Sequence, residues 1–264
     1  MNKILCSVEV LTHNSASTLS KTLESLVDFD QVIILDGNSS DDTRKIANDF
    51  GCQIIEQDSQ FQKKRNSIGD FAGIRNQGLM QAKHKWFLFV DSDEIVTKSL
   101  ANEIFEIINS GTEAAAYWVP RKYVLNGEVI ERACTYPNRQ MRFFGIDGAF
   151  SFVKKVHERI QLKPGTEVCY LKNEILVPVD IDRVARMRKM RYYIQIEFER
   201  HSEMTPKQYL TFVFHHVGVS GLYLVRTIRN MFVGSGKRLP FSFELDYHIY
   251  HILLCKKFIE KIRI

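Results

Sequence analysis

Two aspartates separated by one serine, Asp91 and Asp93, follow directly after the short apolar run WFLFV. We expect this run to be a strand of an open parallel sheet, and ligands of such sheets bind at the carboxyl ends of the strands. Two carboxylates at that point suit a hard divalent cation, Mg²⁺ or Mn²⁺, which keeps its other coordination positions for water and phosphate oxygens. Such a cation would neutralise a diphosphate leaving group. The alternative is that both acids only cap the next helix.

Two further residues have types and positions that suit a nucleotide. Asp36 ends the apolar run QVIILD, and Arg75 lies in GIRNQG, ahead of WFLFV. An acid at the end of a parallel strand can accept hydrogen bonds from a nucleotide, and a planar guanidinium group can hold a phosphate. The alternatives are a turn residue for Asp36 and a solvated helix face for Arg75. Glu94, next to the aspartate pair, is either a further site residue or a carboxylate at a helix start.

Strands and helices are predicted to alternate in the first half of the chain, and these elements would position the residues above. Units of this length imply a parallel sheet with helices on both faces. Glu9 is unusual in an otherwise apolar strand and needs a partner if it is buried. The predicted strands cover 4–11, 31–36, 52–57 and 86–90, and the helices begin near residue 17 or cover about 41–50, 68–82 and 97–109.

The middle and the end of the chain have a different character. The runs AAAYWVP, RQMRFF and FVKKV predict strands that extend the sheet, and Asn126-Gly127 predicts a two-residue hairpin. From Asp182 the chain is predicted to be helical, with further helices over about 206–233 and 242–262. The fold class is therefore α/β, with a mostly parallel central sheet flanked by helices and a helical C-terminal region.

Length and composition describe an ordinary globular protein. The chain has 264 residues, of which 45% are hydrophobic and 25% charged, and its formal net charge is +5. Five scattered cysteines without a CxxC pair argue against a disulfide framework or a structural zinc site, and they fit a reducing cytoplasm. The first residues read as a strand rather than a secretion signal, and no apolar stretch is long enough to predict a spanning helix.

The runs VLTHN, VIILDGNSSDDT and GIRNQGLMQAKHKWFLFVDSDE resemble, in order and spacing, the inverting glycosyltransferases of family 2, which have the GT-A fold. The resemblance covers about residues 4–110 and extends through RQMRFF and KKVHERI to about residue 160. This second part is similar to the glucosyltransferase-like subgroup that builds lipopolysaccharide cores and related bacterial surface glycans. In that subgroup an R-x-x-R-x-F strand precedes a V-H-E or V-H-D element.

The resemblance implies roles for five residues. Thr12 and Asp36 look like nucleotide contacts, and Arg75 looks like a contact to the nucleotide or its diphosphate. Asp91 resembles the residue near the ribose and the metal, and Asp93 resembles the direct metal ligand. One departure concerns the loop after the first strand, where many members carry acidic residues and this chain has the run SAS after the asparagine.

A base must remove the proton of the acceptor hydroxyl during in-line attack at the anomeric carbon. The resemblance places the V-H-E element where the acceptor enters, so Glu158 is the first candidate and His157 the second. His157 is alternatively a metal or phosphate ligand. In a regular strand the two side chains would point to opposite faces. The alternative for Glu158 is a surface pair with a neighbouring basic residue.

The C-terminal helices combine apolar and basic residues, as in YLTFVFHHVGVSGLYLVRTIRNMFV. Such segments can lie in a membrane interface with their basic side chains at anionic head groups. A helical cap on the sheet or a homo-oligomer interface is the alternative. Nucleic-acid binding is not expected, because no recognised module surrounds the basic residues. The expected location is the cytoplasm, with peripheral attachment to the inner face of the cytoplasmic membrane.

These observations predict a GT-A catalytic domain over residues 1–180 and a helical region over 181–264. Within the domain, about 1–110 would bind the nucleotide-sugar and about 111–180 the acceptor. The predicted reaction is inverting transfer of a hexose from a UDP-sugar, with Mg²⁺ or Mn²⁺, to a glycan or lipid-linked acceptor of bacterial surface polysaccharide. A nucleotidyltransferase that makes nucleotide-sugars and a non-catalytic scaffold with the same fold are the rivals. The loop THNSASTL disfavours the first, since it lacks a glycine- and lysine-rich phosphate loop.

Overall fold

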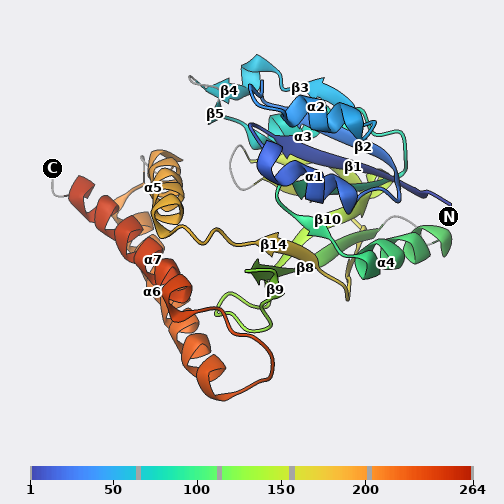
Figure 1. Cartoon of the computed structure of the whole chain (residues 1–264). Coiled ribbons are helices and arrows are strands. Elements are labelled where there is room, and N and C mark those ends of the chain that lie inside the picture. Colours follow the sequence, from blue (N-terminus) through green and yellow to red (C-terminus); the bar gives the residue numbers. More distant parts are fainter. Residues whose placement is uncertain (1, 64–66, 112–114, 155–157, 201–203, 263–264) are drawn as a thin grey trace. The chain divides into compact units, whose positions relative to one another are not determined.

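The chain divides into two compact units by the contacts among its residues, and Figure 1 shows their elements in the computed structural model. Unit 1 consists of Met1–Lys122 and Asn138–Val177, and unit 2 of Tyr123–Pro137 and Pro178–Ile264. The structure describes residues 2–63, 67–111, 115–154, 158–200 and 204–262. The domain boundary near residue 180 stays a prediction.

A four-stranded parallel layer forms the centre of unit 1. Its strands lie in the order β3-β2-β1-β6, and all neighbours are parallel. In the register, Thr12 of β1 pairs with Asp36 of β2, and Leu11 of β1 pairs with Asp91 of β6. The carboxyl ends of three strands are therefore level at one edge. The strands are β1 (Ile4–Thr12), β2 (Phe29–Asp36), β3 (Gln53–Glu56) and β6 (Trp86–Asp91).

Helices cover both faces of this layer because successive side chains of a strand point to opposite sides. Val8 and Val10 of β1 share a buried cluster with leucines and alanines of α1 (Ala16–Glu24), α2 (Thr43–Asp49) and α4 (Lys98–Asn109). On the other face, α3 (Phe71–Leu79) packs its Ile74 against Ile33 and Leu35 of β2. Glu9, between Val8 and Val10, therefore points toward α3.

Antiparallel strands extend the sheet beyond β6. Strand β10 (Arg139–Gly145) pairs with β6 on one side and with β8 (Ala115–Leu125) on the other. Strand β13 (Glu167–Tyr170) pairs with β8, and β7 (Ile95–Val96) pairs with β14 (Ile175–Pro178). Two small ribbons and two 3-10 turns complete the unit. They are β4 (Gln62–Lys63) with β5 (Ser67–Ile68), β11 (Ala149–Val153) with β12 (Arg159–Leu162), η1 (Ser59–Phe61) and η2 (Ile146–Gly148).

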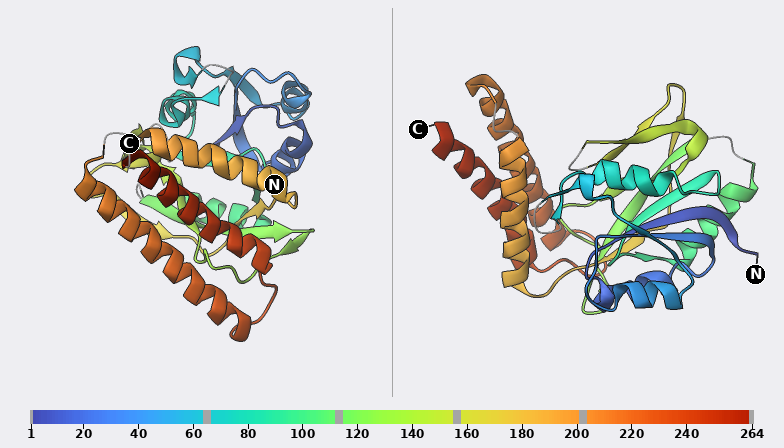
Figure 2. Two further views of the ribbon diagram at one scale, coloured as in Figure 1. Left: turned by 90° about the vertical axis from the view of Figure 1, so that its left-hand side faces the viewer. Right: turned by 90° about the horizontal axis from the view of Figure 1, so that it is seen from above.

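Unit 2 is a layer of three long helices with a short hairpin. Helix α7 (Phe241–Ile262) lies between α5 (Arg183–Arg200) and α6 (Pro206–Phe232), as Figure 2 shows. The predicted hairpin is present, because the end of β8 pairs with β9 (Glu128–Val129) and both Asn126 and Gly127 have positive φ angles of 54° and 79°. Across the described ranges of the chain, none of the helices combines the length and the apolar character needed to cross a membrane.

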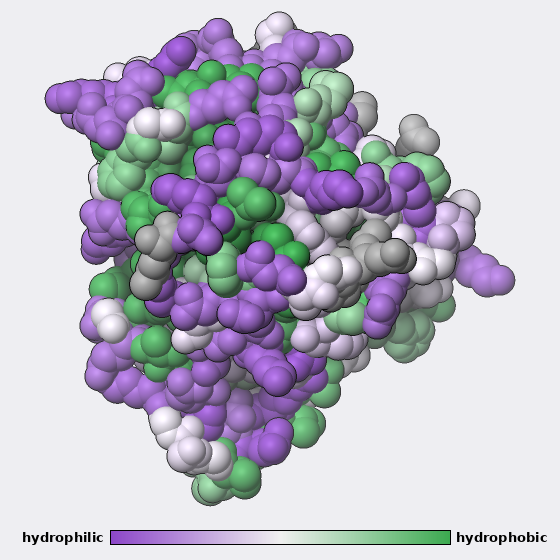
Figure 3. Space-filling model, turned by 90° about the vertical axis from the view of Figure 1, so that its right-hand side faces the viewer, coloured by the Kyte–Doolittle hydropathy of each residue, from purple (hydrophilic) through white to green (hydrophobic). Residues whose placement is uncertain are grey.

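The predicted fold class is confirmed, while several boundaries differ from expectation. Helix α3 begins at Phe71 instead of near residue 68, because the Asp70 side chain accepts from the Gly73 N–H and caps the helix at 2.9 Å. Helix α2 begins at Thr43, after the two aspartates expected in its first turn. The face of the molecule in Figure 3 is mainly hydrophilic, and its hydrophobic residues form separate patches rather than one continuous area.

Candidate functional site

Arg75 lies at the centre of a buried charged network beside the carboxyl ends of the parallel strands. It belongs to α3, and its side chain is only 1% exposed. Its guanidinium group donates to Glu9 Oε1 and to Asp91 Oδ1, each at 2.8 Å, and its Nε donates to Glu158 Oε1 at 3.3 Å. Three carboxylates from β1, β6 and the segment before β12 thus converge on one cation. The solvated helix face considered for Arg75 is wrong.

Of the three carboxylates that Arg75 contacts, Glu9 is the most deeply buried. Its residue is 0% exposed, and within the described residues its Oε2 has no hydrogen-bond partner. Burial raises the pKa of Glu9 to about 7, although the adjacent Arg75 acts in the opposite direction. A Cβ atom on Gly78 of α3 would lie 2.1 Å from this oxygen. The glycine therefore gives the carboxylate the space that it occupies.

Asp91 is held between two guanidinium groups. Its Oδ1 accepts from Arg75 at 2.8 Å, and its Oδ2 accepts from Arg142 of β10 at 3.0 Å. Desolvation alone would raise the pKa of the Asp91 carboxyl, but Arg142 and then Arg75 outweigh it and hold the pKa far below its usual value. The side chain is still 42% exposed, so it reaches solvent while it is ion-paired.

A second group of buried charged residues holds the backbone of Asp91. The Asp91 N–H donates to Glu94 Oε2 at 2.9 Å, and Glu94 is fully buried beside Arg142 and Arg121. Desolvation raises the pKa of Glu94. The guanidinium groups of Arg75 and Arg142 lie 4.7 and 4.6 Å from the ring centroid of Phe89, which is a cation–π distance. Glu94 is thus a buried carboxylate that fixes the turn after β6.

Thr12 and Asp36 meet at the ends of β1 and β2, as the parallel register requires. Thr12 Oγ1 donates to Asp36 Oδ1 at 3.1 Å, and the Ser39 N–H donates to Asp36 Oδ2 at 3.0 Å. Both residues are buried, so in this structure Asp36 fixes the loop that follows β2. Asn38 in that loop has a positive φ of 61°. The nucleotide contacts predicted for Thr12 and Asp36 stay predictions.

The loops after β1 and β6 are joined directly. Ser15 and Ser92 hydroxyl oxygens are 2.9 Å apart, and Thr22 Oγ1 of α1 donates to the Ser92 carbonyl at 3.0 Å. The Asn14 N–H donates to Ser39 Oγ at 2.9 Å, which adds the loop after β2. Asn14 and Ser15, in the loop that departs from the family pattern, therefore link the ends of the three strands.

The two candidate bases have different outcomes. Glu158 lies immediately before β12, outside a regular strand, and its side chain is 17% exposed. Among the described residues Glu158 pairs with buried Arg75, so it is not the solvated surface residue of the alternative, whose possible partner Lys155 lies outside the described residues. His157 lies outside the described residues. The premise that strand alternation separates the two residues does not apply, because Glu158 is not part of a strand.

The predicted metal ligands fit a divalent cation only in part. Asp91 and Asp93 share one turn, but both oxygens of Asp91 accept from guanidinium groups. Asp93 is half-buried at the start of the turn after β6. Over the described ranges, there is no group of three or more histidine, cysteine or acidic side chains that could hold an ion. Mg²⁺ or Mn²⁺ can also bind through one or two carboxylates with the remaining ligands from phosphates and water.

Arg142 is the important residue to which the sequence assigned no role. The run RQMRFF was interpreted as a strand that resembles the R-x-x-R-x-F strand of the subgroup, without a role for Arg142, although an arginine among buried strand residues requires an acidic partner. Arg142 is 4% exposed, and its ion pairs with Asp91 and Glu94 explain its burial. Four carboxylates (Glu9, Asp91, Glu94 and Glu158) thus face three guanidinium groups (Arg75, Arg121 and Arg142).

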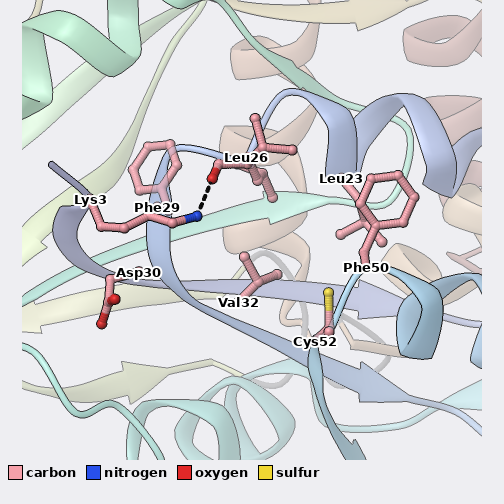
Figure 4. A pocket seen from close by; sticks show the side chains of 10 residues that line it. Lys3, Leu23, Leu26, Phe29, Asp30, Val32, Phe50 and Cys52 are labelled. Atoms are coloured by element: carbon pink, nitrogen blue, oxygen red, sulfur yellow. Dashed lines mark hydrogen bonds between the residues drawn. The ribbon is translucent and has the colours of Figure 1, made fainter. Parts of the chain in front are cut away.

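A separate hollow lies at the opposite, amino edge of the parallel strands. Figure 4 shows it between the end of α1 and the starts of β2 and β3, where the Lys3 ammonium donates to the Val27 carbonyl. Leucine, phenylalanine and valine side chains form most of its lining, and Asp30 is the one acid. None of the predicted site residues lines this hollow. It therefore has no part in the charged network.

The comparison with protein families gives one match, to the model described as Glycosyl transferase family 2, over residues 7–161. This range contains the whole charged network from Glu9 to Glu158 and covers more than half of the chain. The three helices of unit 2 lie outside it.

Three curated relatives are glycosyltransferases by name. The chain is 25% identical over 150 residues to the SPbeta prophage-derived glycosyltransferase SunS of Bacillus subtilis, covering 56% of this chain and 33% of SunS. It is 24% identical over 159 residues to the lipopolysaccharide core biosynthesis glycosyltransferase LpsC of Rhizobium meliloti, covering 60% and 57%. It is 29% identical over 130 residues to the UDP-Glc:alpha-D-GlcNAc-diphosphoundecaprenol beta-1,3-glucosyltransferase WfaP of Escherichia coli, covering 47% and 50%. The matched part thus spans a third to about half of these relatives.

Among solved structures, the crystal structure of S. aureus TarS 1-349 in complex with UDP is similar at 16% identity, with a TM-score of 0.49, covering 98% of this chain and 92% of that chain. The family match includes the parallel strands, α3 and the antiparallel β10. The predicted GT-A fold is confirmed, and the chain belongs to glycosyl transferase family 2.

Proposed function

We propose that this chain transfers a hexose from a UDP-sugar to a glycan or lipid-linked acceptor, with inversion at the anomeric carbon. The observation that carries the proposal is the convergence of Asp91 and Glu158 on buried Arg75, at the carboxyl edge of a parallel sheet in a family 2 glycosyltransferase. Ligands of parallel sheets bind at this edge. A partly exposed carboxylate with a fixed orientation is what proton removal from an acceptor requires.

A relative and the local chemistry support the proposed donor. WfaP acts on UDP-glucose by its name, and a UDP-sugar is the corresponding donor here. Thr12 and Asp36 are the proposed contacts to the nucleotide, and Arg75 the proposed contact to the nucleotide or its diphosphate. Since Asp36 is buried below the loop at Ser39, nucleotide binding would involve movement of that loop.

A divalent cation, Mg²⁺ or Mn²⁺, would be held by Asp93 together with Asp91. When bound, such an ion supplies positive charge to the departing diphosphate. Among the carboxylates of the network, Asp91 is the one that its two arginines keep ionised and that still reaches solvent, where a cation could contact it. Arg142 and Arg75 lower the pKa of Asp91, so they keep its carboxylate ionised as well as oriented.

Glu158 is the proposed base. It would accept the proton of the acceptor hydroxyl as that oxygen forms a bond to the anomeric carbon, and the bond to the diphosphate oxygen would break with its electron pair leaving on the diphosphate. Arg75 Nε, at 3.3 Å from Glu158 Oε1, fixes the carboxylate. His157 is the second candidate for the base. The acceptor is proposed to belong to bacterial surface polysaccharide or lipopolysaccharide. LpsC is named for lipopolysaccharide core biosynthesis, and the name of WfaP gives alpha-D-GlcNAc-diphosphoundecaprenol as its acceptor.

The test begins with the release of nucleotide from UDP-, GDP- and dTDP-sugars by the purified chain, with and without MnCl₂. We expect UDP release from a UDP-hexose in the presence of the metal. Asp93→Asn is expected to lower that rate by about a hundredfold or more, because the cation is lost from the leaving group. Glu158→Gln is expected to lower UDP release by about a hundredfold, because water then lacks its base, while UDP still raises the melting temperature.

Asp30→Asn is the matched control, since Asp30 lies on β2 at the opposite edge of the sheet and pairs with Lys83. It removes one carboxylate charge and should leave the rate unchanged. A chain that releases no nucleotide from any of these donors before or after the changes would be a scaffold. Release of pyrophosphate from UTP and a sugar 1-phosphate would identify a nucleotidyltransferase instead.

A further inference from the structure

Helix α6 presents an apolar stripe that no other element of unit 2 covers. Phe214, Val225 and Phe232 are 68%, 64% and 82% exposed, values typical of surface charges rather than of large apolar side chains. Most of the other exposed apolar residues of the helix lie three, four or seven residues from one another or from these three, and so lie on the same side. They are Leu210, Val217, Leu224, Ile228 and Met231, while the exposed Leu222 lies on the flank of the stripe.

The opposite face of the same helix is already packed. Tyr209 and Phe212 join the cluster that Ile194, Leu254 and Phe258 form between α5 and α7, and Thr227 is 1% exposed. The exposed stripe is therefore not an unfilled part of the helix packing. Helix α6 lies at one edge of the three-helix layer (Figure 2), with α7 on one flank only. A helix of 27 residues is about 40 Å long, so the stripe is long as well as apolar.

The lysines and arginines of α6 and of the segments that flank it are not accompanied by acids. The sequence contains no aspartate or glutamate from Met204 to Phe243, while it contains five lysines and arginines in that range. Lys207 and Arg229 of α6 are exposed beside the apolar residues. Unit 2 as a whole has sixteen basic and ten acidic residues, a formal charge of +6, whereas the whole chain carries +5. The net positive charge of the protein thus comes entirely from unit 2.

We propose that α6 binds flat on an anionic lipid membrane, with Phe214, Val225 and Phe232 inserted among the acyl chains and Lys207 and Arg229 at the head groups. An exposed apolar stripe on a helix whose lysines and arginines are not accompanied by any acid of the same helix is the arrangement of interfacial helices. Anionic head groups supply the negative charge that the helix surface lacks. A second copy of the chain is disfavoured as the occupant, because two such faces would bring like charges together without an acid to pair them.

The test is flotation of the full chain with vesicles of phosphatidylcholine alone or with 30% phosphatidylglycerol, without any sugar donor. We expect binding to the anionic vesicles and a marked loss of binding in high salt. Replacing Phe214, Val225 and Phe232 together by glutamine should weaken binding about tenfold or more. The double change Lys207→Gln with Arg229→Gln should weaken it by roughly fivefold for each residue and flatten the salt dependence.

Met80→Gln is the matched apolar control, since Met80 is 77% exposed and belongs to unit 1. This change should leave vesicle binding unchanged. All five altered residues of α6 are at the surface, so far-ultraviolet circular dichroism should match the wild type. The proposal is overturned if the chain ignores anionic vesicles, or if the triple variant binds them equally well. A dimer in light scattering that the triple variant dissociates, without vesicle binding, would assign the stripe to a second copy. Because no donor is present, these outcomes are independent of the proposed transferase activity.

Discussion

Glu9 shows at the residue scale how a buried charge is both useful and costly. One oxygen of its carboxylate accepts a hydrogen bond from Arg75 and so fixes that side chain, while the other oxygen has no hydrogen-bond partner among the described residues. Arg75 is its attractive neighbour, and Glu158 and Asp91 repel it. Removing a carboxylate from water beside two other carboxylates disfavours ionisation. Ionised Glu9 therefore destabilises the folded chain, and the size of this effect depends on pH.

The first prediction concerns the stability of Glu9→Gln as a function of pH. Because the folded-state pKa of about 7 lies above the unfolded value near 4.3, the folded wild type binds the extra proton between these values and loses stability as the pH rises. The variant lacks this loss. We expect its stability relative to wild type to improve by up to about 3 kcal/mol between pH 5 and pH 8, in urea unfolding at four pH values.

Glu56→Gln is the control for this experiment, since Glu56 is an exposed acid at the end of β3. Its stability difference from wild type should be nearly constant over the same pH range. A constant difference for Glu9→Gln as well would show that Glu9 is not the titrating group. Activity of the Glu9 variant is expected to fall, because Arg75 then loses its charged anchor.

The sequence could identify these residues one at a time but not as a network. Asp91, Arg75 and Glu158 were each proposed from motif and type, and Glu9 was identified as needing a partner. That partner became clear only when α3 was placed on the face of β1 toward which Glu9 points. Arg142 was missed because its carboxylates follow β6, about fifty residues earlier, and meet it only through the antiparallel pairing of β10.

At the scale of elements, α3 must approach β1 closely enough for Arg75 to reach Glu9. Gly78, one turn after Arg75, makes this approach possible, because any Cβ there would collide with the Glu9 carboxylate at 2.1 Å and with Leu35 at 2.9 Å. The glycine is helical, so its role is space rather than an unusual backbone angle. A glycine destabilises the helix relative to alanine, but here it allows Arg75 to reach Glu9.

Gly78→Ala is expected to destabilise the chain by about 1–3 kcal/mol, because the added methyl group overpacks a buried site and displaces Glu9. Gly218→Ala in α6 is the matched change, since nothing lies within 4 Å of a Cβ there. It should stabilise the helix by about 0.5–1 kcal/mol, as alanine is the better helix former. Both values come from thermal or urea unfolding. Equal effects at the two positions would contradict the account of Gly78.

Element types followed from the sequence more readily than element partners. Apolar periodicity correctly indicated the parallel strands and the helices between them, since those patterns reflect local burial. Helix α3 was expected to begin too early because the capping role of Asp70 was not recognised. The pairing of β10 between β6 and β8 depends on contacts distant in sequence. Periodicity carries no information on such partners.

At the scale of the whole molecule, the net charge differs between the two units. Unit 1 contains the charged network and has twenty basic and twenty-one acidic residues, whereas unit 2 has the entire positive excess. Each unit has its own buried clusters, in the sheet faces of unit 1 and between the helices of unit 2. A unit with its own core can be stabilised locally by its own ligand.

Hydrogen–deuterium exchange should therefore separate two ligand responses within one chain. UDP with MnCl₂ is expected to slow exchange around Thr12, Asp36 and Asp91, because bound ligand suppresses local opening there. Uridine without its diphosphate should give weaker protection, since the arginines and the cation would have no phosphate to contact. Vesicles with phosphatidylglycerol should instead protect α6 while leaving those three strand ends unchanged. If UDP protected α6 as strongly as the strand ends, or if vesicles protected the strand ends alone, the assignment of nucleotide to unit 1 and membrane to unit 2 would be wrong.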